Sequence, residues 1–270
     1  MKRIPAAFQF LTIIPIRIRG ELSGADMSGS AVFFPLVGFL QGAFLAVISF
    51  VSLTFLSPAV TSILVISAYL LTNGGFHQDG LSDTFDALSV KSTGDGDKDR
   101  QKRLAVMRDP SAGPIGVAVI VISLLLKYGL LKEILEKPGH AFFSPAVLLM
   151  PAVAAWSMTM TMPGARSARS DGLGKIFLGS VKASHACLAT ILLVLLSCVA
   201  CVLTGTGQHA YENIRTFFLF FASACVAALC AAYGLRRLCT ARFGGLTGDN
   251  LGAIHEAAET MLLFAAVLCF

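Results

Sequence analysis

The stretch AVFFPLVGFLQGAFLAVISFVSLTFL, residues 31–56, runs for 26 residues without one ionisable side chain. A helix of about 20 apolar residues is enough to span the hydrocarbon core of a bilayer. The rest of the chain has the same character, because its 270 residues are 55% hydrophobic and only 14% charged. Charged residues make up about a quarter of an average soluble domain. The composition therefore predicts a polytopic integral membrane protein.

Other apolar segments predict a bundle of about six to seven transmembrane helices. The segments cover residues 31–56, 57–73, 112–131, 142–162, 186–203 and 216–235, with a shorter tail near 257–270. Backbone groups inside lipid must find partners within their own segment, which favours helices over open strands. The expected fold class is all-α. Residues 1–270 are expected to form a single membrane domain with one enlarged cytoplasmic loop at about 74–111.

Two patterns inside the apolar segments are interpreted as packing. Gly38 and Gly42 have the small-residue spacing that lets two helices approach closely. Cys198 and Cys201 form a C-x-x-C, but they lie in an apolar segment, where cysteine behaves as a small hydrophobe.

The charge pattern predicts an orientation. Lys and Arg gather in residues 1–30, 74–111, 163–185 and 236–256, and two predicted spans separate each of these segments from the next. All four segments should therefore lie on one face, which the positive-inside rule makes cytoplasmic. The net charge of +5 comes without a basic tail or an interleaved aromatic stripe, so no nucleic-acid partner is expected.

The candidate chemistry is concentrated in GGFHQDGLSDTFD, residues 74–86. On a helix, with about 100° per residue, Asp83 lies roughly +40° and Asp86 roughly −20° from Asp79. Three like charges on one face repel each other strongly in a low dielectric, which favours a bound cation, and hard oxygen ligands suit Mg²⁺ or Mn²⁺. A solvated acidic face is the alternative interpretation. Ionisable residues at a membrane boundary favour the metal site.

His77 belongs to the same motif but lies about 160° from the carboxylates on the same helical wheel. It is therefore a candidate general base, acting from the turn before the helix, rather than a metal ligand.

Two basic stretches are candidate phosphate-binding sites. The first holds Arg103 and Arg108; the second holds Arg166 and Arg169, with glycines nearby. Guanidinium groups bind phosphate through two parallel hydrogen bonds. Ordinary positive-inside charge explains one such cluster, but two clusters converging on an acidic face favour phosphate binding.

Two further polar segments are considered as binding sites; the first has two possible interpretations, and the second is rejected. In the glycine-rich stretch 244–252, Asp249 is either a fourth acidic ligand, or Asp249 or Asn250 caps a helix. The stretch DGDKDR, residues 95–100, begins like a calcium loop but has Arg100 and Val106 where an EF-hand needs Gly and Glu. We expect a mobile polar loop there.

Several of these motifs together resemble the adenosylcobinamide-GDP ribazoletransferase (cobalamin synthase) family. The resemblance covers nearly the whole chain. It rests on Phe10-Leu11-Thr12-x-x-Pro15, Phe34-Pro35-Leu36-Val37-Gly38, the 74–86 motif, Met107-Arg108-Asp109, Gly172-Leu173-Gly174 and Thr247-Gly248-Asp249-x-Leu251-Gly252-Ala253. The chain departs from the family pattern at Gln78, which is usually apolar, and at Ala87, which is usually Gly.

The resemblance implies a bacterial inner-membrane enzyme whose active site faces the cytoplasm. Its substrates would be adenosylcobinamide-GDP and α-ribazole, or α-ribazole 5′-phosphate. The products would be adenosylcobalamin, or its 5′-phosphate, and GMP, with Mg²⁺ as cofactor. Asp79, Asp83, Asp86 and Asp249 would hold the metal, and His77 or Asp83 would assist the chemistry. Arg103, Arg108, Arg166, Arg169 and Asn250 would bind substrate. A homo-oligomer, or association with other cobalamin-pathway enzymes, is a further expectation.

Two rival functions stay open at this point. A cation-coupled transporter would place its carboxylates near the bilayer midplane in broken helices, whereas these carboxylates cluster with arginines at one loop edge. Another membrane transferase with an aspartate motif, such as a prenyltransferase or an alcohol phosphatidyltransferase, is closer. The latter motif has Ala-Arg where this chain has Asp83-Thr84.

Overall fold

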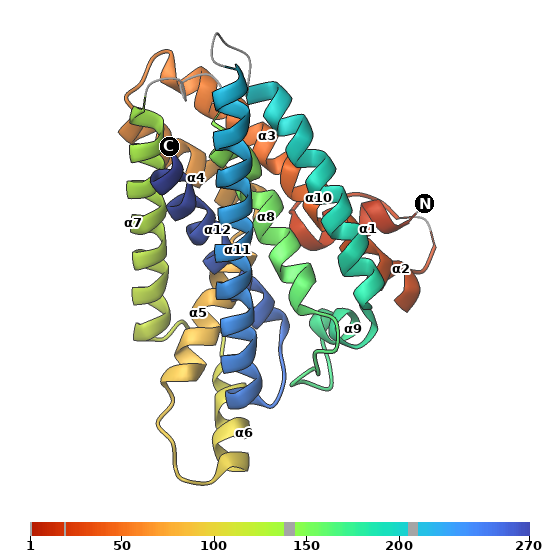
Figure 1. Ribbon diagram of the computed structural model, residues 1–270. Helices are drawn as coiled ribbons and strands as arrows, with labels where there is room; N and C mark the ends of the chain where they lie inside the picture. The colour runs from red at the N-terminus through yellow and green to blue at the C-terminus, as the bar shows by residue number, and fades with distance from the viewer. Residues whose placement is uncertain (1, 19, 138–143, 205–209) are drawn as a thin grey trace.

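The protein is a bundle of helices (Figure 1). A computed structural model describes residues 2–18, 20–137, 144–204 and 210–270. The elements are α1 (Arg3–Leu11), α2 (Gly24–Ser30), the 3₁₀ helix η1 (Ala31–Phe33), α3 (Phe34–Leu53), α4 (Pro58–Asn73), α5 (Phe76–Ser89), α6 (Gly96–Val106), α7 (Pro114–Glu136), α8 (Pro145–Thr161), α9 (Leu173–Ser180), α10 (Ala183–Thr204), α11 (Ala210–Phe243) and α12 (Gly248–Cys269). Within these residues there is no strand, only one isolated bridge between Ser167 and Leu246. The all-α prediction is confirmed.

Each of the seven predicted membrane segments contains a helix, although the boundaries differ. In the described part of the chain, five helical stretches are long and apolar enough to cross a membrane, and the bent pair α4–α5 is a sixth candidate. Helix α8 is shorter, with 17 residues, and residues 142–143 of its predicted segment lie outside the described ones. The predicted tail at 257–270 is the second half of α12, whose 22 residues begin at Gly248. The fold is that of a polytopic helical membrane protein.

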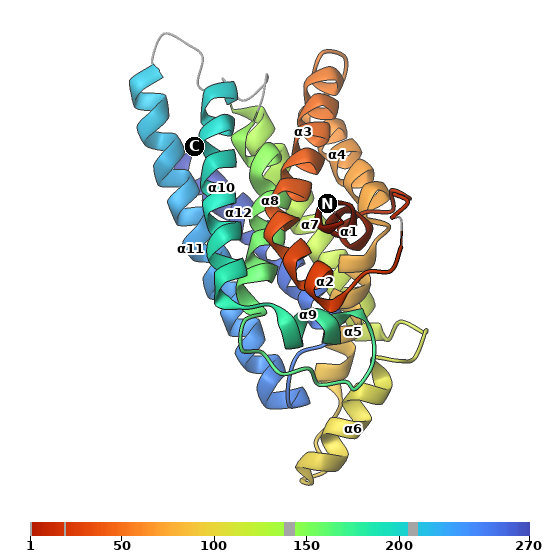
Figure 2. The ribbon, with the colours of Figure 1, turned by 90° about the vertical axis from the view of Figure 1, so that its right-hand side faces the viewer.

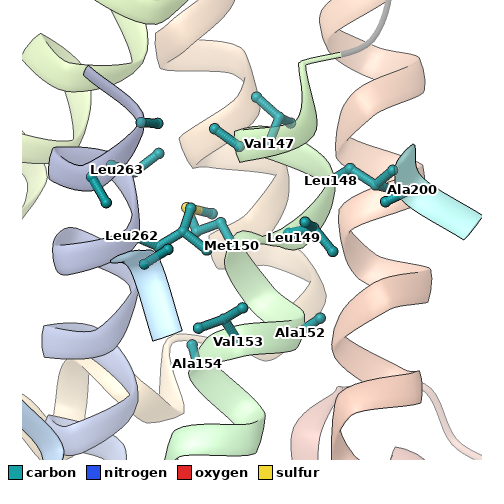
Figure 3. Packing of buried hydrophobic residues seen from close by; sticks show 14 of the residues in the cluster. Val147, Leu148, Leu149, Met150, Ala152, Val153, Ala154, Ala200, Leu262 and Leu263 are labelled. Carbon is teal, nitrogen blue, oxygen red and sulfur yellow. The ribbon is translucent and has the colours of Figure 1, made fainter. Parts of the chain in front are cut away.

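Helix α8 forms the centre of the bundle. Its residues are apolar or small throughout, and every one from Pro145 to Thr159 is buried. Figure 3 shows Leu148 and Met150 of α8 in one cluster with Ala200 of α10 and Leu262 of α12. A helix that is apolar on all sides belongs inside a bundle, so α8 serves as the scaffold around which the other helices are arranged.

The Gly38–Gly42 spacing is confirmed as a packing motif. A Cβ atom added to Gly42 would lie 1.9 Å from the carbonyl oxygen of Leu148, and one added to Gly38 would lie 2.3 Å from that of Pro151. Only glycine at these two positions of α3 permits this contact with the α8 backbone.

The segment 74–111, expected to form an enlarged loop between spans, is largely helical and contains α5 and α6. Helix α4 is followed by Gly74 and Gly75, whose φ angles are +65° and +71°. Residues with a side chain rarely adopt such positive φ angles. The axes of α4 and α5 meet at 88°. This turn directs α5, with the aspartate motif, against α7 and α12.

The polar stretch predicted to be a mobile loop also begins a helix. The Asp95 side chain accepts hydrogen bonds from the N–H groups of Asp97 and Lys98. It thereby caps the N-terminus of α6, as Asp often does.

Three of the four basic segments, 74–111, 163–185 and 236–256, lie at the same end of the bundle (Figures 1 and 2). The N-terminal segment packs beside that end, since the ring of Phe10 lies 4.5 Å from that of Phe177 in α9. The structure thus gathers the polar parts of the chain where the sequence predicted one common face.

Candidate active site

A cavity of about 380 Å³ lies at this polar end. Its polar lining comes from four parts of the chain: α1, the start of α5, the segment 167–175 and the start of α12. The polar side chains are Gln9, His77, Asp79, Ser167, Arg169, Asp171, Lys175, Thr247 and Asp249. Carboxylates and cations therefore share one cavity.

Three helix N-termini meet in this cavity. Its wall includes the first turns of α5, α9 and α12. The starts of α9 and α12 touch through their backbones, because a Cβ added to Gly174 would lie 2.6 Å from the nitrogen of Gly248. Helix N-termini present free N–H groups and the positive end of the helix dipole. Such an arrangement favours binding of phosphate groups.

Three carboxylates gather next to these helix starts. Helix α5 runs through the aspartate motif, so Asp79 and Asp83 share one face as predicted. Asp83 is half-buried and lies within electrostatic range of Asp79 and Asp249. Within the described residues, neither the Asp79 nor the Asp83 side chain has a hydrogen-bond or ion-pair partner. These two carboxylates are free to bind a cation.

Asp86 has a different environment from the other two motif aspartates. Its Oδ2 accepts a hydrogen bond from the Gly113 N–H at 2.7 Å, and its Oδ1 accepts one from the Gly116 N–H at 2.8 Å. Gly113 is the residue that precedes α7 and offers no side chain of its own. Asp86 therefore caps α7 and ties it to α5. Like Asp83, it does not line the cavity, where Asp79 is the one motif aspartate in the wall, and its predicted metal ligation stays a prediction.

Of the four predicted phosphate-binding arginines, only Arg169 lines the cavity. Its Nη1 lies 3.0 Å from Asp249 Oδ2, and its Nη2 donates to the Met107 carbonyl at 3.1 Å. Its Nε has no hydrogen-bond partner in the part of the chain that the structure describes. Arg108 lies at the edge of the site, where it forms a 3.0 Å ion pair with Asp171.

The other two arginines lie elsewhere, which corrects the expectation that Arg103 and Arg166 face the acidic residues, although each basic stretch reaches the site through its other arginine. Arg103 is buried on α6, 3.9 Å from Asp99, and donates to the Arg242 carbonyl. Arg166 is exposed and lines a separate cavity with Arg236 and Arg237. Arg103 lies away from the cavity because it belongs to helix α6, which packs it against the end of α11.

The start of α12 is capped by Thr247, rather than by Asp249 or Asn250. The Thr247 hydroxyl accepts from the Asn250 N–H at 3.2 Å, and the Asn250 Oδ1 accepts from the Thr247 N–H at 2.9 Å. The amide of Asn250 also donates to the Thr84 hydroxyl at 3.0 Å. Asn250 is therefore buried in a structural role that joins α12 to α5, and Asp249 is left to face the cavity.

His77 lies in the first turn of α5, not in the turn before it as predicted. It is buried and forms part of the cavity wall. Its ring stacks on that of His255, with centroids 3.8 Å apart. His77 therefore lines the cavity, and its role as a general base stays a prediction.

Sequence reasoning missed three polar residues that the structure makes prominent. Asp171 and Lys175 line the cavity, although they had been treated only as part of a basic segment. Lys127 is buried between α7 and α12, in contact with Glu256 and Glu259. A lone lysine inside the predicted span 112–131 was the available signal, since charges within spans are rare and functional.

Comparison with known proteins gives one family. The family model for cobalamin-5-phosphate synthase matches residues 3–267. An adenosylcobinamide-GDP ribazoletransferase of Thermodesulfovibrio yellowstonii is 31% identical over 268 residues, covering 99% of this chain and 96% of that one. Proteins of the same name from Pseudomonas fluorescens and Pseudomonas syringae are 33% and 34% identical, each over 97% of this chain and over 98% and 97% of their own.

No solved structure matches the chain. The family match extends over almost the whole length and includes the cavity, the aspartate motif and the start of α12. The chain therefore belongs to the cobalamin-5-phosphate synthase family.

Proposed function

We propose that this protein joins adenosylcobinamide-GDP to α-ribazole, or to α-ribazole 5′-phosphate, and releases GMP. The product is adenosylcobalamin or its 5′-phosphate. The observation that supports this most is the single cavity that combines three helix N-termini with Asp79, Asp249 and Arg169. The names of the relatives support the same reaction.

The chain's own groups suit the binding of a pyrophosphate. The first residues of α9 and α12 line the cavity together with Arg169 and Lys175, and the ammonium of Lys175 donates to the Ser170 carbonyl. Phosphoryl transfer depends mainly on holding the reacting groups in line and on neutralising charge. A donor with two phosphates would fit these positive groups and place its phosphorus beside His77.

The free carboxylates fit a divalent cation. Asp79 and Asp83 have no partner among the described residues, and Asp249 is paired only with Arg169 and the Thr247 hydroxyl. Oxygen donors of this kind are those that Mg²⁺ takes together with substrate phosphates. Asp79, Asp83 and Asp249 would hold the ion, while Asp86 holds α7. When bound, Mg²⁺ supplies charge neutralisation at the phosphate oxygens.

The bond changes balance with one proton released. The 5′-hydroxyl oxygen of the acceptor forms a bond to the cobinamide-side phosphorus, and the bond from that phosphorus to the GMP oxygen breaks. The proton lost by the hydroxyl passes to His77, the imidazole in the cavity wall.

The location of the cavity supports a cytoplasmic active site. It lies at the end of the bundle that carries the basic segments, and basic loops remain on the cytoplasmic side. We propose a multi-pass protein of the bacterial inner membrane whose cavity opens to the cytoplasm.

Product analysis tests the proposal. Detergent-purified protein is incubated with adenosylcobinamide-GDP, α-ribazole and Mg²⁺, and GMP and adenosylcobalamin are quantified by chromatography. Both products should appear in equal amounts and should be lost with EDTA. Folded protein that forms neither product with Mg²⁺ present would overturn the proposal.

A further inference from the structure

The interior of the bundle contains four ionisable side chains that the proposed reaction does not use. Lys127 comes from α7, and His255, Glu256 and Glu259 come from α12. Each is at most 2% exposed. We call this group the buried cluster. Ionisable groups inside membrane bundles are rare, and those present usually have a function.

The formal charges of the buried cluster do not balance. The ammonium of Lys127 lies 2.6 Å from Glu256 Oε2 and also contacts Glu259 Oε2. One cation thus faces two carboxylates. An uncompensated negative charge in an apolar interior is strongly unfavourable, so the cluster requires one more positive charge.

Buried polar atoms without a hydrogen-bond partner indicate where this positive charge would lie. Three atoms have no hydrogen-bond partner in the described part of the chain: Glu256 Oε1, Glu259 Oε1 and His255 Nδ1. The potential ligand atoms of these residues all lie within 4.8 Å of one another. His255 Nδ1 is 3.0 Å from Glu259 Oε1 without hydrogen-bond alignment. Buried polar atoms normally have partners, so these atoms point to a missing one.

A proton meets the requirement better than a metal ion does. A divalent ion would leave the cluster with an excess positive charge. Hard cations also take six or more oxygen ligands, whereas this site offers two carboxylates and one nitrogen. We propose that Glu256 and Glu259 share one proton, and that the buried cluster is a proton-binding site.

Neighbouring helices add no further cation. The groups that act electrostatically on the cluster from other helices are Tyr69 of α4 and His77 of α5. The hydroxyl of Ser123, on α7, lies 3.4 Å from Glu256 Oε2. The phenol and the hydroxyl are neutral, and imidazoles that are neutral leave the charge balance unchanged. A protonated His255, 3.0 Å from Glu259, would balance the cluster instead and would leave no carboxylic acid in it, so the experiment below distinguishes the two.

The proton-binding site is linked to the cavity through two stacked rings. Glu259 contacts His255, and His255 stacks on His77 in the cavity wall. His255 and Glu259 are therefore positioning residues for His77. This link rests on the proposed function, whereas the proton-binding site itself does not.

Infrared spectroscopy of the purified protein tests the site without any assay of activity. At neutral pH in sodium-free buffer, the wild-type protein should show the carbonyl stretch of one buried carboxylic acid. Glu256→Gln and Glu259→Gln should each abolish this band, because the remaining carboxylate and Lys127 then neutralise each other. Glu133→Gln, which removes an exposed carboxylate of α7, should keep the band.

Three outcomes would overturn the proton assignment. The first is the absence of the band in folded wild-type protein, and the second is its survival in both cluster variants. The third is its disappearance when sodium is added, which would make the site a sodium site. For the link to His77, Glu259→Gln should lower kcat for GMP release and leave KM for both substrates nearly unchanged, while Glu133→Gln should change neither constant. A Glu259→Gln enzyme with wild-type kcat would contradict the link.

Discussion

Arg169 and Asp249 form an ion pair of 3.0 Å across the cavity. Their side chains remain 17% and 25% exposed. The pair joins the segment before α9 to the first turn of α12, so it holds together the two halves of the site. When the substrate and metal bind, Arg169 can leave Asp249 for a phosphate group and Asp249 can leave Arg169 for Mg²⁺, because guanidinium groups bind phosphate and carboxylates bind Mg²⁺.

Substitution of Arg169 should weaken binding of the phosphate donor. A hydrogen bond to a charged group contributes about 1.5–3 kcal/mol, so Arg169→Ala should lower kcat/KM for the donor by roughly 10- to 100-fold. Arg166→Ala is the matched control, because Arg166 lines another cavity. Initial rates at varied donor concentration measure both. Equal losses in the two variants would contradict this assignment of Arg169.

Asp86 should matter for stability through its cap on α7. Asp86→Ala leaves the N–H groups of Gly113 and Gly116 without their acceptors. We expect a loss of about 1–3 kcal/mol in the free energy of unfolding for each buried group left unsatisfied. Asp86→Asn, which keeps one acceptor oxygen, should lose less. Thermal unfolding in detergent measures both. A variant with normal stability but no turnover would instead favour metal ligation by Asp86.

The close approach of α3 to α8 should tolerate no side chain at Gly42. A Cβ there would meet the Leu148 carbonyl, and overpacking of a core costs about 1–3 kcal/mol. Gly42→Ala should therefore lower the midpoint of thermal unfolding. Gly129→Ala is the control, because nothing lies within 4 Å of a Cβ at that position of α7. That substitution should leave the midpoint unchanged or raise it.

The segment before α6 should lose local stability only in strong acid. Hydrogen bonds from Ser92, and also from Thr93, lower the pKa of Asp99 from 3.8 to about 2. A carboxyl group whose pKa is lowered in the folded state stabilises the fold at every pH above its ordinary pKa. This stabilisation is lost as the pH falls from about 4 to about 2.

Hydrogen exchange of the α6 amides measures this loss. The protection factors of these amides, relative to the intrinsic exchange rate at each pH, should fall over that pH range in the wild type, and Asp99→Asn should already show low protection factors at neutral pH. The exposed neighbour provides the control, Asp97→Asn. An Asp99→Asn variant that exchanges like the wild type would contradict the role of Asp99.

The sequence predicted the helical membrane fold because composition and apolar run length report it directly. The seven helices appear where the apolar segments lie, and Gly38 and Gly42 form the predicted helix contact. The helix boundaries were less predictable. Helix α12 begins at Gly248, in a polar stretch that lies outside the apolar segment but is mostly buried in the bundle. The bend at Gly74–Gly75 packs α5 against α7 and α12, and the apolar segments gave no indication of this packing.

The sequence indicated which types of residue form the site, but not which of them contact one another. The spacing of Asp79 and Asp83 was sufficient to place them on one face. It could not show that Asp86 binds the amides of α7, because that contact joins residues about 30 positions apart. Nor could it show that Arg103 donates to the Arg242 carbonyl at the end of α11, or that Lys127 meets Glu256 and Glu259. Such contacts depend on helix packing, which periodicity does not specify.

Turnover of Asp83→Asn tests the central claim most directly, since this carboxylate has no structural partner among the described residues and lies beside Asp79 and Asp249. GMP release from adenosylcobinamide-GDP is measured with saturating Mg²⁺ and α-ribazole, alongside Asp97→Asn, whose carboxylate is exposed on α6. We predict a loss of at least about 100-fold in Asp83→Asn, with unchanged thermal unfolding and near wild-type rates in Asp97→Asn. Wild-type turnover by a folded Asp83→Asn enzyme would contradict the account.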